Sequence, residues 1–283
     1  MTPDAPMLLS AALGTLVGLI LALTGAGGAI VAVPLLVFGL GLEVASAAPI
    51  GLLAVGLSAG VGALLALQEG KVRYKAAALM AASGSVVSPL GLWVAHRVPD
   101  APLTLAFACV LAFVAARMLR GARSPGANPT PTATRADPPC RLDLARGKLD
   151  WTAPCARALA LSGAGAGFLS GLLGVGGGFV IVPALRRASD VPMQGIVATS
   201  LAVIALVSAT GVVASAASGN MLWAAALPFA AGSLAGMLGG RGLARYVSGA
   251  RLQQAFAVFA GCVALGMAAK AFHAGLAAGL FVS

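Results

Sequence analysis

The chain has 283 residues, of which 59% are hydrophobic and only 9% are charged, far below the charged fraction of about one quarter in soluble domains. A soluble globular domain is therefore excluded. The formal charge of +10 does not indicate nucleic-acid binding, because the basic residues fall in short segments between apolar runs. Runs without any charge cover residues 5–42, 158–185 and 191–240, each longer than the roughly 20 residues that cross a bilayer. Because the alternating ten-residue segments of membrane barrels are absent, the sequence predicts an all-α integral membrane protein.

Each half of the chain predicts the same series of elements: an apolar segment interrupted by glycines, then three uninterrupted apolar spans. The uninterrupted spans are expected at residues 45–67, 76–95, 101–119, 194–218, 221–240 and 252–270. Between the halves, residues 121–156 are rich in proline and polar residues, which is typical of a disordered linker. The chain therefore divides into a first transmembrane repeat at 1–120 and a second at 157–283.

The four cysteines lie at positions 109, 140, 155 and 262, without the close pairing of a zinc or redox site. We therefore expect four free thiols, no metal site and no cofactor.

The two glycine-interrupted segments are copies of one motif. LTGAGGAIVAVPLL at 23–36 is echoed by LGVGGGFVIVPAL at 173–185, at an offset of 149 residues. The same offset aligns the small-residue pattern Gly14-x3-Gly18 with Gly163-x3-Gly167-x3-Gly171, which is typical of close helix packing. Further along, Gly84-Ser85 matches Gly232-Ser233 after a slip of one residue. The sequence therefore indicates a duplication of the whole chain.

The basic residues predict that the two copies have opposite orientations. Loop 69–75 carries three cations and its counterpart 219–222 carries none, whereas loop 39–45 carries none and its counterpart carries Arg186 and Arg187. By the positive-inside rule, this alternation indicates inverted-topology repeats.

One topology places nearly all basic residues in the cytoplasm. It puts loops 69–75, 117–157, 186–190 and 241–251 inside and leaves only Arg97 and Lys270 elsewhere. Each glycine-interrupted segment must then enter and leave on one side, as a re-entrant or two-helix hairpin. Both termini are predicted outside and the linker inside.

Interrupted helices at matching positions of inverted repeats are the best sequence pointer to a transporter's binding site. The residues so indicated are Thr24, Gly25, Gly27, Gly28, Gly174, Gly176, Gly177 and Gly178. A helix that begins after such a loop directs free N–H groups and its positive dipole end at the cavity, which suits an anion. The alternative is that these glycines only permit a tight turn and close packing.

Hydroxyl groups on the spans that follow the glycine motifs are further candidate ligands. Ser58, Thr199, Ser200 and Ser208 are predicted to donate hydrogen bonds to an oxyanion, although serine and threonine also bond to their own helix backbone. The acidic residues Glu43, Glu69 and Asp190 lie at predicted span ends, so no carboxylate is placed as a proton relay. We therefore expect an uncoupled or weakly coupled mechanism, in which the membrane potential alone drives export of a monovalent anion.

The motifs GAGGAIVAVPLL and GVGGGFVIVPAL, followed by AAPIGL and VATSL, resemble the sulfite exporter TauE/SafE family over both halves. The resemblance implies a multi-pass transporter of the bacterial inner membrane that moves sulfite or organosulfonates. Two departures concern the first copy: it has Ala29 opposite Gly178, and APIGL at 48–52 in place of the ATSL at 198–201. The first half-site is therefore expected to have lost hydroxyl contacts.

Other function classes fit the sequence less well. A permease for a metal cation or another small solute is the alternative, but a cation site would need carbonyl or carboxylate ligands in the membrane. A membrane enzyme would need a nucleophile with a base or a ligand cluster, and two histidines near span ends supply neither. The expected partners are a small anion and the lipid bilayer, and the oligomeric state, a homo-oligomer included, is left open.

Overall fold

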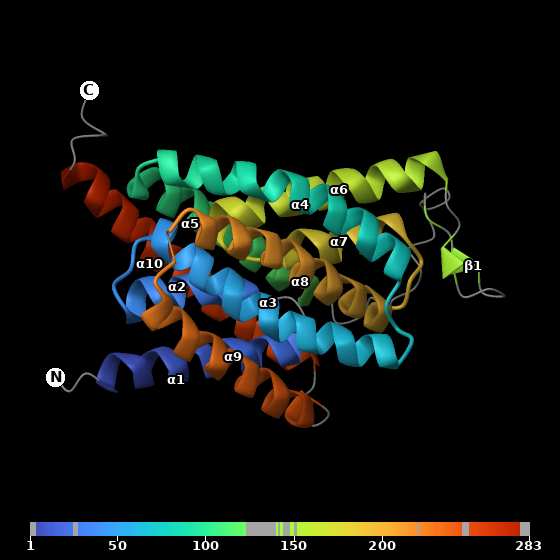
Figure 1. Ribbon diagram of the computed structural model, residues 1–283, viewed down its shortest axis with the longest axis horizontal. Helices are drawn as coiled ribbons and strands as arrows, with labels where there is room; N and C mark the ends of the chain where they lie inside the picture. The colour runs from blue at the N-terminus through green and yellow to red at the C-terminus, as the bar shows by residue number, and fades with distance from the viewer. Residues whose placement is uncertain are drawn as a thin grey trace.

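The computed structural model describes residues 4–24, 28–122, 140, 142–143, 148–149, 152–219, 221–244 and 249–277. Within these residues the protein is a bundle of long helices that run roughly along one direction (Figure 1). The first half contains α1 (Asp4–Thr24), α2 (Gly28–Gly39), α3 (Val44–Gln68), α4 (Tyr74–Arg97) and α5 (Asp100–Ala122). The second contains α6 (Ala153–Leu173), α7 (Gly178–Ala188), α8 (Met193–Ala217), α9 (Trp223–Ala244) and α10 (Gly249–Ala277).

The all-helical membrane class is confirmed. Among the described residues, six helices are long and apolar enough to cross a membrane, namely α1, α3, α4, α6, α8 and α9. The predicted spans at 45–67, 76–95 and 101–119 correspond to α3, α4 and α5, and those of the second half correspond to α8, α9 and α10. Within α5 and α10 the described apolar stretches are shorter, at residues 100–116 and 257–272.

Each glycine motif joins a long helix to a short one. α1 and α6 have 21 residues each, whereas α2 has 12 and α7 has 11. At about 1.5 Å per residue, only the longer limb spans a hydrocarbon core of about 30 Å. Each pair therefore forms an unequal hairpin, called here the first hairpin (α1–α2) and the second hairpin (α6–α7).

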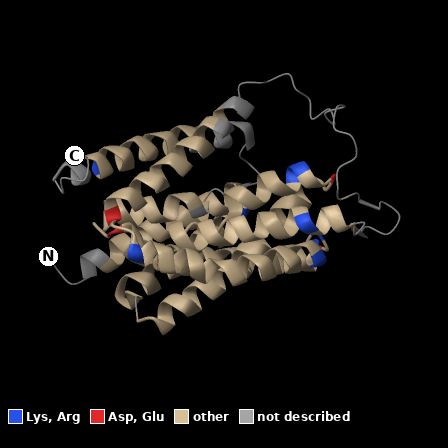
Figure 2. Cartoon of the chain, turned by 90° about the horizontal axis from the view of Figure 1, so that it is seen from above, with Lys and Arg blue, Asp and Glu red and all other residues tan. Residues whose placement is uncertain are grey.

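The loops gather at two ends of the bundle. At the basic end, loop 69–73 contacts α8 and α9: the Arg73 N–H donates to Thr199 Oγ1 (3.1 Å), and Glu69 pairs with Arg241. At the opposite end, loops 40–43, 98–99 and 218–222 surround one cavity. Figure 2 shows most of the coloured lysines and arginines at the end of the bundle away from the start of α1 and the end of α10.

The helices of the two halves interlock rather than forming separate bundles. α1 packs mainly against α9 and α4 against α6, while α3 packs on α8 and α5 on α10. Glycines permit the closest approaches, since a Cβ at Gly14 would overlap the backbone of Phe229 and one at Gly163 the backbone of Met80. The two contacts correspond to each other, because Gly14 and Gly163, and likewise Met80 and Phe229, are 149 residues apart.

The contacts keep this offset where the sequence comparison introduced a slip. Gly18 contacts Ser233, and Gly167 contacts Gly84. Because Gly18 and Gly167 are equivalent, their partners Ser233 and Gly84 must be equivalent too, so Gly84 does not correspond to Gly232. The expected slip of one residue is therefore wrong, because helix packing holds a register that the serine match did not reveal. Positions 149 residues apart are called equivalent positions below.

Two expectations for the linker are also wrong for the residues described there. Cys140 and Cys155 form a disulfide, with their Cα atoms 5.0 Å apart, instead of remaining free thiols. The disulfide joins Cys140 to the start of α6. The Cys140 N–H also donates to the Ala188 carbonyl at the end of α7. Strands β1 (Leu142–Asp143) and β2 (Lys148–Leu149) form a short antiparallel pair, so these residues are not without structure. Cys109 and Cys262 are free, as expected.

Candidate functional site

The second hairpin turns through a buried loop at residues 174–178, called here the second glycine loop. Gly174 ends α6 with φ 70°, and Gly176 and Gly177 follow with φ 66° and 69°. These left-handed conformations explain the glycines, because a Cβ would strain the backbone. At Gly177 a Cβ would also lie 2.7 Å from the Ala166 carbonyl oxygen. The loop then passes into α7, whose first N–H groups precede the first intrahelical bond.

The second glycine loop lies between the two halves of the chain. Its Gly174 carbonyl is 3.2 Å from the position of a Cβ on Gly51 in α3. A Cβ on Gly176 would contact Ile204 at 3.0 Å and Val55 at 3.4 Å, and these two residues belong to α8 and α3. Val55 and Ile204 lie in the inner turns of their 25-residue helices. The predicted loop residues of the second half are therefore brought together deep inside the bundle.

The first hairpin is described only in part. Thr24 is the last residue of α1, and its hydroxyl donates to the Ile20 carbonyl (2.7 Å). Gly28 begins α2 and is buried against Leu21, where a Cβ would clash with the backbone. Gly25 and Gly27, which the sequence also assigned to the site, lie outside the described residues.

Three of the four predicted hydroxyl ligands make hydrogen bonds within the protein. Ser58 Oγ lies 2.8 Å from Ser233 Oγ, across the contact of α3 with α9. Thr199 donates to the Gly195 carbonyl (2.6 Å), and Ser200 donates to the Val197 carbonyl (2.9 Å). Their assignment to a substrate stays a prediction.

The fourth predicted hydroxyl, that of Ser208, belongs to a different group. Ser88, Ser170 and Ser208 are fully buried, and their Oγ atoms have no hydrogen-bond partner among the described residues. A buried hydroxyl without a partner costs about 1–3 kcal/mol. Sequence reasoning missed Ser88 and Ser170. The available signal was the position of Ser170 directly before Gly171, at the end of the glycine pattern that was interpreted only as packing.

A cavity of about 290 Å³ opens at the basic end. It is lined by residues of α1, α3, α8 and α9 that include Leu21, Gly62 and Met237, with Lys71 and Arg241 at its charged rim. Glu69 pairs with both cations, at 2.7 Å from Lys71 Nζ and 3.4 Å from Arg241 Nη2. The hydrogen bond and charge of Lys71, with a smaller contribution from Arg241, lower the pKa of the Glu69 carboxyl.

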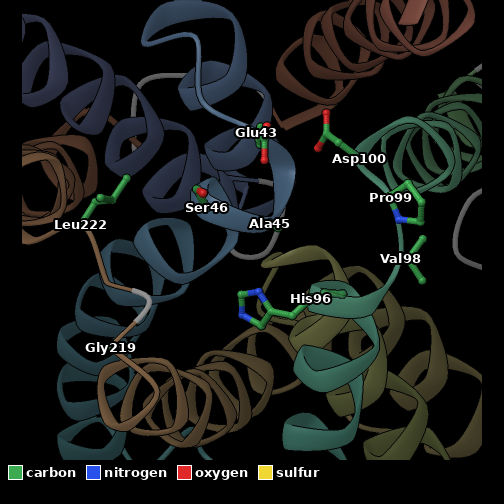
Figure 3. Close-up of a pocket in the computed structure, with 10 residues that line it drawn as sticks. Glu43, Ala45, Ser46, His96, Val98, Pro99, Asp100, Gly219 and Leu222 are labelled. Carbon is green, nitrogen blue, oxygen red and sulfur yellow. The ribbon is translucent and has the colours of Figure 1, made fainter. Parts of the chain in front are cut away.

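A second cavity of about 540 Å³ lies at the opposite end (Figure 3). Glu43, His96 and Asp100 come from three different elements and lie around its opening. Asp100 is held in place by the Val44 N–H, which donates to its Oδ1 (3.0 Å), and by Thr104 (3.4 Å). The two cavities therefore differ in charge: cations line the first, and two carboxylates line the second.

Long apolar helices, two unequal hairpins and a cavity at each end of the bundle define a multi-pass helical membrane protein. A family model, sulfite exporter TauE/SafE, matches residues 10–267. The chain is 31% identical over 229 residues to a probable membrane transporter protein of Xylella fastidiosa (strain 9a5c), covering 79% of each chain. It is 30% identical over 226 residues to the protein of the same description from strain Temecula1 / ATCC 700964, again covering 79% of each.

A third relative, probable membrane transporter protein YunE of Bacillus subtilis (strain 168), is 43% identical over 67 residues, 24% of each chain. No solved structure matches the chain. The protein belongs to the sulfite exporter TauE/SafE family.

Proposed function

We propose that the protein is a secondary transporter of small anions, of the class of sulfite and organosulfonates, which bind between two inverted repeats at the broken-helix ends. The observation that carries this proposal is the second glycine loop, which is buried between α3 and α8 and leads into the N-terminus of α7. Such an N-terminus combines free N–H donors with the positive end of a helix dipole. The equivalent residues of the first hairpin, Thr24, Gly25, Gly27 and Gly28, are proposed to complete the site.

The arrangement of the helices supports the inverted-repeat part of the proposal. Contacts recur at equivalent positions. The contact of Gly14 with Phe229 corresponds to that of Gly163 with Met80. The contact of Gly18 with Ser233 corresponds to that of Gly167 with Gly84. Exchanging the halves thus exchanges α1·α9 with α6·α4. Rocking of one such repeat against the other is the common basis of alternating access.

The charges at the two ends support an anionic substrate. Lys71 and Arg241 at the cavity of the basic end would raise the local anion concentration, whereas the carboxylates at the opposite end would not retain an anion. We place the basic end in the cytoplasm of a bacterial cell, by the positive-inside rule. Outward movement of a monovalent anion is then favoured by about 2.3 kcal/mol per 100 mV.

The test is flux of labelled sulfite into proteoliposomes under an imposed potential, with sulfate, sulfonates, chloride and divalent metal cations as competitors. We expect potential-driven flux that sulfonates compete for. Absence of flux for every anion, in protein shown to be folded and inserted, would contradict the proposal, and metal-dependent flux would favour a cation permease.

A matched pair of glycine variants separates a site effect from backbone strain. Gly177 and Gly219 both have left-handed φ, at 69° and 71°, but only Gly177 has a neighbour within 4 Å of its Cβ position. Gly177→Ala should therefore abolish flux, whereas Gly219→Ala should retain it. Equal loss in both variants would mean that the second glycine loop has no special role.

A further inference from the structure

The hydroxyls of Ser88, Ser170 and Ser208 make no hydrogen bond to the helices that carry them. A helical serine ordinarily donates to the carbonyl one turn earlier, as Ser215 does to Gly211 (2.9 Å). The three serines are 0% exposed, and none has a hydrogen-bond partner in the described part of the chain. Buried donors are nearly always satisfied, so unsatisfied ones indicate an acceptor from outside the chain, which is a water, an ion or a ligand.

Two of these hydroxyls, those of Ser208 and Ser88, lie beside the same part of α8. Ser208 Oγ lies 3.4 Å from the position that a Cβ on Gly176 would occupy, so it faces the second glycine loop. Ser88 Oγ lies 3.6 Å from the Cβ position of Gly211, one helical turn after Ser208. The Cβ position of Gly176 lies 3.0 Å from Ile204 and that of Gly211 lies 2.8 Å from Leu52, so both hydroxyls lie among apolar side chains at places where the chain has only glycine.

The third hydroxyl is at the entrance to the same loop. Ser170 lies in the last turn of α6, and its carbonyl accepts the N–H of Gly174 (2.8 Å). The next residue, Gly171, contacts the backbone of Ser88 so closely that a Cβ would overlap it. α4, α6 and α8 therefore each contribute one hydroxyl around the second glycine loop.

The set of equivalent positions carries no hydroxyl. The equivalent positions of Ser170, Ser208 and Ser88 are Leu21, Ala59 and Met237. The packing is otherwise similar. Met237 lies next to the Cβ position of Gly62, and Ser88 lies next to the Cβ position of Gly211, which is the equivalent of Gly62. Hydroxyls are thus present on one side only of a duplicated framework.

We propose that Ser88, Ser170 and Ser208 form the oxyanion-binding side of the transport site and donate one hydrogen bond each to the three oxygens of a sulfite or sulfonate group. This inference rests on the proposed function and makes it more specific. A sulfonate presents three acceptor oxygens on one sulfur, which suits three donors carried by α4, α6 and α8, helices that pack against one another. The N-terminus of α7 favours an anion over a sodium ion, for which hydroxyl oxygens are also ligands.

The inference is tested by ligand binding and stability together, in the full chain in nanodiscs. Ser88→Ala, Ser170→Ala and Ser208→Ala should each bind sulfite and methanesulfonate roughly tenfold or more weakly, the loss of one hydrogen bond to a charged group. Without ligand, each should melt at the same temperature as the wild type or higher, because an unsatisfied hydroxyl has been removed. A merely structural serine would show the opposite pattern.

Ser215→Ala is the control, because Ser215 is equally buried on α8 but bonds to its own helix. It should bind sulfite normally and melt at a lower temperature. If the wild type transports sulfite and all three alanine variants bind it unchanged, the inference fails while the proposed function stands. Stabilisation by sodium and by no anion would also overturn it. If the wild type transports no anion, the proposed function itself fails.

Discussion

The two halves of this chain have the same packing but different chemistry. Across the contact of α3 with α9, the Ser58 and Ser233 hydroxyls satisfy each other at 2.8 Å. The equivalent positions, Val207 on α8 and Gly84 on α4, carry no side-chain hydroxyl, and a Cβ on Gly84 would lie 2.9 Å from the Val207 side chain. Around the second glycine loop the situation is reversed, since Ser208 is unsatisfied and its equivalent is Ala59.

This difference teaches that duplication preserves a framework more strictly than a binding site. Glycines such as Gly14 and Gly163 are held by contact between helix backbones, where any side chain would separate the helices. A hydroxyl that faces the interior has no such packing constraint. The apolar residues Leu21, Ala59 and Met237, at the positions equivalent to Ser170, Ser208 and Ser88, show this freedom.

The largest effect should come from breaking the shared framework. Gly18→Leu and Gly167→Leu should both prevent stable folding, each costing more than about 3 kcal/mol, because their side chains would overlap the backbone of α9 or α4. Monodispersity on size-exclusion chromatography after extraction measures this. Gly165→Leu is the control, since Gly165 is exposed and nothing lies within 4 Å of its Cβ position. A folded Gly167→Leu protein would show that the halves are not held by these contacts.

The disulfide between Cys140 and Cys155 closes part of the linker and tests the orientation. Closing a loop of 15 residues is worth about 3 kcal/mol in the chain-entropy model, so reduction of the purified protein should lower its melting temperature. In cells we expect Cys140 and Cys155 to be reduced, because the linker is placed in the cytoplasm. Maleimide labelling of acid-quenched cells, with Cys109→Ser and Cys262→Ser as background, measures the thiols. A fully oxidised pair would instead place the linker outside.

Removing one serine from each half should have opposite effects on stability. Ser58→Ala breaks a hydrogen bond and should cost about 1 kcal/mol, whereas Ser208→Ala removes an unsatisfied hydroxyl and should cost nothing or stabilise. Thermal unfolding without ligand distinguishes the two. Equal destabilisation by both substitutions would show that Ser208 has a partner within the protein.

The smallest effect should come from the ion pairs of Glu69 with Lys71 and Arg241 at the basic end. Because the pKa of Glu69 is below its ordinary value of 4.5, the pairs add stability above pH 4.5, and this is lost as the pH falls through the lowered pKa. Melting curves from pH 7 to pH 3 should show a slightly smaller acid loss in Glu69→Gln. Because the site is exposed, high salt should reduce the difference. An unchanged pH dependence would mean that these pairs do not stabilise the fold.

The sequence by itself determined the helical membrane class, the positions of the spans and the glycine motifs, because hydropathy and backbone freedom are local properties. It also indicated that the first half-site is poorer in hydroxyls. The tertiary structure alone decided how α1 packs on α9 and α6 on α4, and therefore which residues of α4 and α9 are equivalent. It also decided the disulfide of Cys140 with Cys155 and the grouping of Ser88 and Ser170 with Ser208. Each of these depends on which helices meet, and residues far apart in the chain carry no local signal of the neighbour they will contact.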